Sequence, residues 1–329
     1  MGLSVARLAG RAGAAGAACP EAAADRVLSW WLPSEIRTER DRLPWRSPPV
    51  APWAVLVSET MLSQTQAARV AQRYPHFISR FATPAALASA PLGEVLRAWQ
   101  GLGYPRRAAG LHRSAGAIVA EHGGEVPSDL RCLLALPGVG RYIARAVLAF
   151  AFGEATMPVD TNIGRVLARV VGRRLSGAEA QAIGDALLGG GMLAIAPPDR
   201  PDRAPGAAAA ALAFMDLGAT LCRPAAPRCP ECPLQTDCNW AQAAASGGEI
   251  LPDPARGSAG VSRAQARFEG SDRQGRGRLL RAAAAGRVAP AELAAAAAWP
   301  DDPARAERVA ATLVAEGLLS LEDGFYGLP

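Results

Sequence analysis

The sequence predicts an all-α fold, and its composition and patterning support that class. Apolar residues make up 50% of the 329 residues but aromatic residues only 5%. Much of the apolar fraction is alanine, the strongest helix former. From about Glu21 onward, apolar residues recur at the spacing of one helix face. No run of 18 or more apolar residues occurs, which excludes a membrane-spanning helix. A net charge of +5 allows a nucleic-acid partner without requiring one.

The lysine and cysteine content of the chain limits the reactions and crosslinks that it can form. The chain contains no lysine, so all 35 basic residues are arginine, and no lysine amine can form a Schiff base with a sugar. Six cysteines are too few for a disulfide scaffold of this size. The segment from Met1 to Cys19 lacks the apolar core of a secretory signal. We therefore expect a cytoplasmic protein.

The chain divides into four predicted segments. Residues 1–20, rich in Gly and Ala, are expected to be a disordered tail, and residues 21–245 to form one large helical domain. Residues 246–262 look like a linker, and residues 263–329 like a small C-terminal module. A length of 329 residues suits two domains, since single domains usually have about 100–200 residues.

Helices are predicted wherever helical spacing lies between turn signals. Thr83-Pro84 is typical of an N-cap followed by proline at the first helical position, and Asp160 is placed to cap a helix. Residues 190–206, rich in Pro, Gly and Ala, are expected to form a loop. The predicted helices of the large domain are 21–31, 53–72, 91–99, 106–121, 128–134, 141–152, 163–171, 177–188 and 207–221.

The C-terminal module has three helical segments, 275–285, 291–297 and 303–316. Two short apolar runs, 318–321 and 325–328, flank Asp323-Gly324, a hairpin turn signal. Three helices and a terminal hairpin predict a winged-helix-like module.

Four cysteines lie close together in the sequence. Cys222, Cys229, Cys232 and Cys238 have the spacing C-x6-C-x2-C-x5-C, so their sulfurs can converge on one centre. Sulfur ligands suit either zinc or an iron–sulfur cluster, and the spacing alone does not separate the two. Cys19 and Cys132 lie outside this group.

A glycine-containing turn separates two predicted helices at Leu136-Pro137-Gly138-Val139-Gly140-Arg141. Gly138 and Gly140 permit another backbone to approach closely. Arg141 begins the next helix, whose first N–H groups can face a DNA phosphate. A plain helix–helix turn is the alternative interpretation.

Several motifs together resemble the helix-hairpin-helix superfamily of base-excision glycosylases, and within it the adenine glycosylase (MutY-type) branch. The resemblance covers about residues 25–240. It implies a two-lobed helix-hairpin-helix fold with a [4Fe–4S] cluster held by the four cysteines. The motifs are residues 43–46 (LPWR), 58–66 (SETMLSQTQ), 101–104 (GLGY), 136–142 (LPGVGRY) and 159–162 (VDTN), with the cysteine run at 222–238.

The resemblance also implies catalytic roles. Tyr142 stands where endonuclease III-type enzymes carry their Schiff-base lysine, which favours a monofunctional glycosylase that uses water. Glu59 lies among apolar residues, where burial should raise its pKa and keep a proton for adenine N7. Asp160 should stay ionised at its helix start and stabilise an oxocarbenium-like sugar. Asn162 would orient Asp160 or water.

The remaining site residues follow from the same motifs. Gln64 and Tyr104 match positions that wedge into the base stack, and Thr65 adjoins the first of them. Trp45, Arg46 and Leu62 match positions that line the adenine pocket. The implied partner is double-stranded DNA with adenine opposite 8-oxoguanine or guanine. We expect a monomer associated with the nucleoid.

The C-terminal segment departs from this pattern. About 67 residues follow the linker, too few for the NUDIX-like domain that reads 8-oxoguanine in many adenine glycosylases. A basic stretch there could bind phosphates, although a solvated charged face is an equal alternative. It contains Arg263, Arg267, Arg273, Arg276, Arg278 and Arg281.

Two other functions remain open from the sequence. One is an endonuclease III-like glycosylase for oxidised pyrimidines, which the missing lysine disfavours. The other is a non-catalytic iron–sulfur DNA-binding regulator, which the pair Glu59 and Asp160 disfavours.

Overall fold

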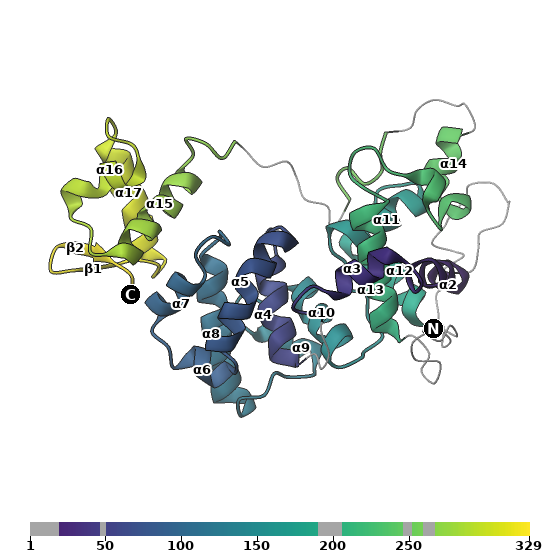
Figure 1. Ribbon diagram of the computed structural model, residues 1–329, viewed down its shortest axis with the longest axis horizontal. Coiled ribbons are helices and arrows are strands. Elements are labelled where there is room, and N and C mark those ends of the chain that lie inside the picture. Colours follow the sequence, from purple (N-terminus) through teal and green to yellow (C-terminus); the bar gives the residue numbers. More distant parts are fainter. Residues whose placement is uncertain (1–19, 47–50, 190–205, 246–251, 259–266) are drawn as a thin grey trace. The chain divides into compact units, whose positions relative to one another are not determined.

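The computed structural model describes residues 20–46, 51–189, 206–245, 252–258 and 267–329 (Figure 1). Across these ranges the regular elements are helices, apart from one two-stranded sheet near the C-terminus. The all-α fold class is therefore confirmed. No helix in the described ranges is long and apolar enough to cross a membrane.

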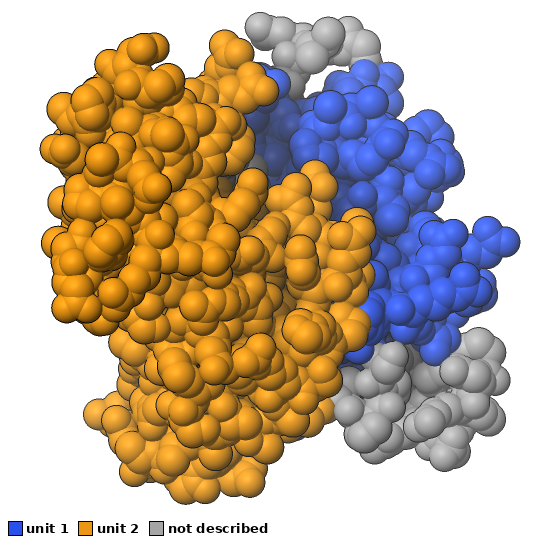
Figure 2. Space-filling model, turned by 60° about the vertical axis from the view of Figure 1, so that its left-hand side comes forward, with its two compact units in different colours: residues 1–50, 141–263 blue, residues 51–140, 264–329 orange. Residues whose placement is uncertain are grey.

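The chain forms two compact units, and each unit is built from two separate segments of sequence. Unit 1 comprises residues 1–50 and 141–263, and unit 2 comprises residues 51–140 and 264–329 (Figure 2). The predicted C-terminal module therefore groups with residues 51–140 in unit 2. The sequence could not show this, because the grouping depends on contacts between distant segments.

Unit 1 packs around the apolar faces of its longer helices. Helix α11 lies against α13 and α14, and α2 lies against α12 and α13. Leu28, Leu167 and Phe214 are almost completely buried in this core. The helices are α2 (Pro20–Trp31), α3 (Glu35–Asp41), α10 (Arg141–Ala151), α11 (Thr161–Val171), α12 (Gly177–Gly189), α13 (Ala207–Thr220) and α14 (Asn239–Ala245), with short 3-10 turns η1 (Cys229–Glu231) and η2 (Gln235–Asp237).

The first part of unit 2 is a set of six helices. Helix α4 packs against α5 and α8, and α8 also contacts α6 and α7. Phe77 meets Phe81 and Trp99 in an aromatic cluster, with ring centroids 4.9 and 5.7 Å apart. The helices are α4 (Pro52–Leu62), α5 (Ala67–Arg80), α6 (Pro84–Ala88), α7 (Leu92–Ala98), α8 (Arg106–His122) and α9 (Leu130–Ala135).

One predicted helix of this unit is wrong in extent. Residues 53–72 were expected to be continuous, but α4 ends at Leu62 and α5 begins at Ala67. Gln64 between them has a φ of +63°, in the left-handed region that a right-handed helix cannot contain. The apolar periodicity of the sequence continues across residues 63–66, so this pattern gives no sign of the break between α4 and α5.

The C-terminal part of unit 2 has the predicted three helices and hairpin (yellow-green to yellow in Figure 1). Strands β1 and β2 pair antiparallel, and Val288 forms an isolated bridge with Tyr326. The elements are α15 (Asp272–Ala285), η3 (Pro290–Glu292), α16 (Leu293–Ala297), α17 (Pro303–Ala315), β1 (Ser320–Glu322) and β2 (Phe325–Gly327).

Polar contacts join this C-terminal part to α7 and α8. The Gly93 N–H donates to the Pro329 carbonyl at 2.7 Å, and a Cβ at Gly93 would collide with that oxygen. Arg106 Nε donates to a carboxylate oxygen of Glu316 at 2.8 Å, and Arg276 pairs with the same carboxylate. These contacts explain why the C-terminal part belongs to the same unit as residues 51–140.

Within the predicted linker, residues 252–258 pack on unit 1. Ser258 is 4% exposed and its hydroxyl oxygen accepts a hydrogen bond from the Leu175 N–H. Asp253 forms an ion pair with the buried Arg169. Residues 246–251 and 259–262 of the linker and residues 1–19 of the predicted tail lie outside the described residues, and helix α2 already begins at Pro20.

Candidate active site

Glu59 occupies a buried position in α4. The helix starts with Pro52 at its first turn, and most of its residues are apolar and inaccessible. Glu59 itself is 5% exposed. Its neighbours Ser58 and Thr60 donate their hydroxyls to carbonyls of the same helix, Val55 O and Leu56 O. The helix thus carries an ionisable group into an apolar environment, and Leu62 is its last residue.

The two residues predicted to wedge into DNA share an unusual backbone conformation. Gln64 has a φ of +63° and Tyr104 a φ of +49°, both in the left-handed region. For residues other than glycine this conformation costs free energy and persists where the surroundings enforce it. The loops are tied together, since Thr65 Oγ1 donates to the Leu102 carbonyl at 2.9 Å.

Arg107 holds both loops, and no motif in the sequence indicates this role. Its guanidinium donates to Thr65 Oγ1 at 2.8 Å and to the Leu102 and Gly103 carbonyls at 3.1 Å each. It also caps the end of α4 through the carbonyls of Thr60, Met61 and Ser63. Burial lowers the pKa of Arg107 to about 10, so the side chain still carries its charge at neutral pH.

The glycine turn between α9 and α10 is built for close approach. Gly138 has a φ of +82°, and a Cβ there would lie 3.3 Å from Gly110 Cα of helix α8. Ser114, one turn along α8, donates to the Pro137 carbonyl at 2.6 Å. Gly140, which precedes α10, is exposed. Helix α10 opens with the exposed Arg141 and the partly buried Tyr142.

Asp160 is the N-cap of α11. Its Oδ1 accepts hydrogen bonds from the Asn162 and Ile163 N–H groups at 2.9 and 2.7 Å, and its Oδ2 accepts one from Asn162 Nδ2 at 3.0 Å. Burial nevertheless raises the pKa of Asp160 above its ordinary range, although these donors oppose the shift. The N–H groups at the helix start therefore favour the ionised form of Asp160, as expected, while burial sets the direction of the pKa shift.

Arg165 links the Asp160 region to the cysteine loop. It is 5% exposed, and its guanidinium donates to Asn162 Oδ1 at 2.8 Å and to the Cys222 carbonyl at 2.6 Å. It also donates to the carbonyl of Gly218 at 2.6 Å. A Cβ at Gly218 would lie 2.6 Å from Asn162 Cβ, so only glycine allows α13 to approach α11 here.

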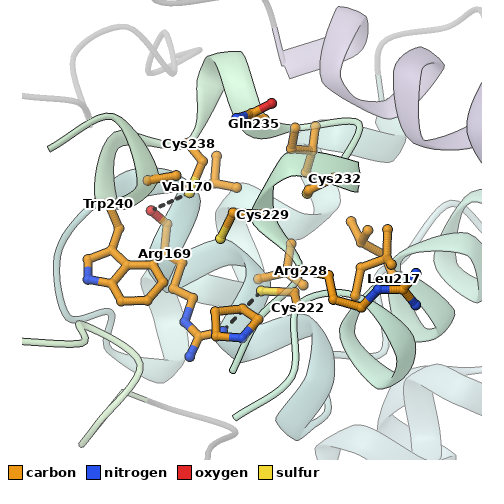
Figure 3. A pocket seen from close by; sticks show the side chains of 15 residues that line it. Arg169, Val170, Leu217, Cys222, Arg228, Cys229, Cys232, Gln235, Cys238 and Trp240 are labelled. Carbon is orange, nitrogen blue, oxygen red and sulfur yellow. Dashed lines mark hydrogen bonds between the residues drawn. The ribbon is translucent and has the colours of Figure 1, made fainter. Parts of the chain in front are cut away.

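The four clustered cysteines line one cavity of unit 1, and Figure 3 shows their sulfurs directed toward a common space. Arg169, which is 2% exposed, donates to Cys222 Sγ at 3.3 Å and lies over the Trp240 ring at 4.6 Å. Cys238 Sγ donates to the Arg169 carbonyl at 3.3 Å. Burial raises the pKa of Cys232 and of Cys238 to about 11. These two are neutral thiols at neutral pH until a metal replaces their protons.

The cysteine cavity offers an all-sulfur donor set beside the Arg169 guanidinium. Within the described residues, no group of three or more His, Cys, Asp or Glu side chains is already arranged to hold a metal ion. Four sulfur ligands suit either zinc or an iron–sulfur cluster.

Arg46, predicted to line the adenine pocket, forms a buried ion pair with Asp216. Both of its Nη atoms bind Asp216 of α13, at 2.8 and 2.9 Å. Asp216 is fully buried and also accepts hydrogen bonds from Trp31 Nε1 and Arg40 Nε. Trp45, the other predicted pocket residue of this segment, is 9% exposed. No motif in the sequence indicates this role of Asp216.

The candidate residues are distributed over both units. The predicted DNA-contact residues before residue 141, together with Glu59 and Leu62, belong to unit 2. Asp160, Asn162 and Tyr142, together with Trp45, Arg46, Arg141 and the four cysteines, belong to unit 1.

Comparison with known proteins decides the family. Residues 57–180, which include Glu59 and Asp160, match the HhH-GPD superfamily of base excision DNA repair proteins. The adenine DNA glycosylase of Mycobacterium tuberculosis is 41% identical over 305 residues, which cover 92% of this chain and 92% of that protein. The chain belongs to the adenine DNA glycosylase family. Because the match to the mycobacterial protein covers 92% of this chain, it must include most of residues 267–329.

Solved structures agree with this membership of the adenine DNA glycosylase family at the level of the fold. A thermostable thymine-DNA glycosylase is 26% identical, with a TM-score of 0.56 over 68% of this chain and 96% of that one. An endonuclease III captured as a covalent DNA intermediate has a TM-score of 0.51 over 67% of this chain and 98% of that one, at 23% identity.

The contribution of the buried Arg46–Asp216 pair to the stability of this protein can be measured. Replacing Arg46 with Ala leaves the fully buried Asp216 without its bidentate partner. We expect the free energy of unfolding to fall by about 2–4 kcal/mol, since breaking a buried pair is costly while Arg40 and Trp31 still donate to Asp216. Urea titration followed by circular dichroism measures the change.

The matched control is Arg80→Ala, because Arg80 pairs with Glu94 and both side chains are more than 40% exposed. An exposed pair contributes about 0–1 kcal/mol. Equal losses in the two variants would contradict the structural importance of the Asp216 site.

Proposed function

We propose that this protein is a monofunctional DNA glycosylase that hydrolyses the N-glycosidic bond of adenine opposite 8-oxoguanine or guanine. The alignment with an adenine DNA glycosylase over 92% of both chains carries this proposal. The residues that the chemistry requires lie within or beside the matched superfamily region, 57–180.

Glu59 would act as the general acid. Adenine leaves readily only after N7 is protonated, so the reaction needs a group that holds a proton near neutral pH. Glu59 is 5% exposed and most residues of α4 are apolar, so its carboxyl group is largely shielded from bulk water.

Asp160 would supply the opposite charge. The departing base leaves an oxocarbenium-like sugar, which a carboxylate can stabilise. Hydrogen bonds from two backbone N–H groups and the Asn162 amide fix the orientation of Asp160. The same donors partly counteract the burial that raises its pKa. Tyr142 would complete this arrangement from the start of α10.

Gln64 and Tyr104 would enter the base stack when adenine is extruded. Extrusion costs a few kcal/mol of unstacking, and an inserted side chain offsets part of it. Arg107 keeps the two loops in their strained conformations through its backbone and hydroxyl contacts. Gly138, Gly140 and Arg141 would hold a flanking phosphate at the start of α10.

The glycosylase would leave the DNA strand uncut, since no lysine exists to form the Schiff base that strand cleavage requires. The test uses duplexes with A opposite 8-oxoguanine, A opposite G, or an oxidised pyrimidine opposite G. We expect breaks at adenine only after hot alkali. Breaks at the pyrimidine without alkali would instead support an endonuclease III-like activity, and no base release would support a non-catalytic DNA-binding protein.

Cys222, Cys229, Cys232 and Cys238 would hold a [4Fe–4S] cluster. When bound, the cluster would crosslink the loop between α13 and α14 and so stabilise unit 1. We expect Cys232→Ala to remove visible absorbance and most bound iron, because one of four ligands in the cavity is lost. Iron analysis and absorption spectroscopy of the purified protein test this.

The control for this cysteine variant is Cys132→Ala, since Cys132 lies on α9 outside the cavity and should leave iron content unchanged. A colourless wild-type protein with one zinc per chain would contradict the cluster.

A further inference from the structure

Unit 2 contains a large cavity whose walls come from α15 and from the two loops that carry Gln64 and Tyr104. Its volume is about 920 Å³, and it is open to solvent. We propose that this groove, defined by Gln64, Arg69, Tyr104, Phe268, Arg273 and Arg281, binds the sugar-phosphate backbone of the DNA on which the active site acts. This inference rests on the proposed function and assigns a DNA-binding role to the C-terminal part of the chain.

The charge of the α15 groove matches a polyanion. Five arginines and no acidic residue occur among its described lining residues. Two of the five, Arg106 and Arg276, are paired with Glu316 and fix the position of α15 against α8. The side chains of Arg69 and Arg281 are exposed and make no hydrogen bond or ion pair with other described residues. Their positive charge is therefore available to phosphates.

The structure divides the basic stretch of the sequence into residues with different roles. Arg267 pairs with Glu269 at an 83% exposed position, and Arg278 donates to the Ala297 carbonyl. Arg263 lies outside the described residues. Arg273, Arg276 and Arg281 are the members that line the groove. If the basic stretch were only a solvated charged face, three of its arginines would not need to line the same groove.

Helix α15 leaves space for a ligand at Gly277. A glycine inside a helix costs about 1 kcal/mol relative to alanine. At Gly275 that cost has a structural reason, because a Cβ would collide with the Trp299 ring. At Gly277, which lines the groove and is exposed, a Cβ would meet nothing within 4 Å. The absent side chain keeps the wall of the groove open.

Phe268 adds a surface for a sugar or an unstacked base. Its side chain is 52% exposed, and the Arg273 guanidinium lies over its ring at 5.3 Å. An exposed aromatic ring beside arginines is typical of surfaces that bind nucleic-acid strands. Since Gln64 and Tyr104 line the same groove, a strand opened at those residues would continue along α15.

The test measures binding without turnover. The probe is a labelled duplex that carries 8-oxoguanine opposite 2′-fluoro-2′-deoxyadenosine, which resists base release. For the double variant Arg273→Gln/Arg281→Gln we expect binding about tenfold weaker than that of wild type at physiological salt, and a slope of log K against log[salt] smaller by about 2. The control is Arg287→Gln/Arg308→Gln, which removes two charges that pair with Asp323 and Asp272 away from the groove. We expect the slope of this control to be that of wild type.

Gly277→Gln provides a second variant that separates binding from folding. It should raise the thermal stability of α15 while its side chain fills the open wall, so DNA binding should weaken as Tm stays equal or rises. Equal salt slopes for the groove and control variants, or undiminished binding by Gly277→Gln, would overturn the proposal. Adenine release is measured separately on the normal duplex. A protein that binds with the expected slopes but releases no adenine would contradict the proposed function and leave the groove assignment standing.

Discussion

Replacing Glu59 with Gln is expected to reduce single-turnover adenine release by about 10³-fold, within the range of general acid catalysis. Glutamine keeps the size of the side chain but cannot donate a carboxyl proton to N7. The position is 5% exposed, and an uncharged residue of the same volume is tolerated there. We therefore expect an unchanged Tm and nearly unchanged affinity for a lesion duplex. Rapid-quench kinetics with excess enzyme and a binding titration measure the two quantities.

Glu121→Gln is the matched control for this experiment. Glu121 lies in the last turn of α8 and is exposed, so its replacement should change neither rate nor affinity. If Glu59→Gln released adenine at near the wild-type rate, another group would have to be the proton donor. If it lost rate and lesion binding in equal proportion, Glu59 would act in substrate binding.

Local spacing accounts for what the sequence predicted correctly. The N-cap at Asp160, the position of four cysteines around one cavity, the burial of Glu59 and the three helices of the C-terminal part each depend on residues near one another in the chain. Propensity, capping and periodicity act over that range.

Long-range contacts account for what the sequence missed. Arg107 joins residues more than 40 positions away, and Asp216 is reached by Arg46 across 170 positions. No periodicity connects such residues. The burial of Asp160 likewise depends on distant parts of the chain. The helix start is local, but the burial that outweighs it comes from the surrounding fold.

Replacing Asp160 with Asn is expected to reduce adenine release by about 10³-fold, the scale of losing one electrostatic stabiliser of the transition state. Asparagine caps helices as well as aspartate does. The hydrogen bonds to the Asn162 and Ile163 N–H groups can therefore persist, and the fold should be retained. Loss of activity in a stable variant would separate a catalytic carboxylate from a simple helix cap.

The raised pKa of Asp160 adds a pH dependence whose sign can be stated. The proposed mechanism needs the ionised form, so as pH falls the rate should decline at a higher pH than for an ordinary aspartate. Stability should change in the opposite sense. Because the folded state binds this proton more tightly than the unfolded state does, the contribution of Asp160 to stability decreases as pH rises through the folded pKa. Asp160→Asn should remove that contribution and be at least as stable as wild type near pH 7.

Asp129 offers the control, because it caps α9 with the same geometry, accepting from the Arg131 and Cys132 N–H groups. The pKa of Asp129 is lowered, chiefly by the backbone hydrogen bond from Cys132. The cap at Asp129 therefore favours the ionised carboxylate, whereas the surroundings of Asp160 favour the protonated carboxyl. Asp129→Asn should leave adenine release and its acid limb unchanged. An equal loss of rate in the two variants would mean that capping, and not the carboxylate charge, explains the requirement for Asp160. If the decline of the release rate at low pH were the same in wild type and in Asp160→Asn, a group other than Asp160 would be responsible for that decline.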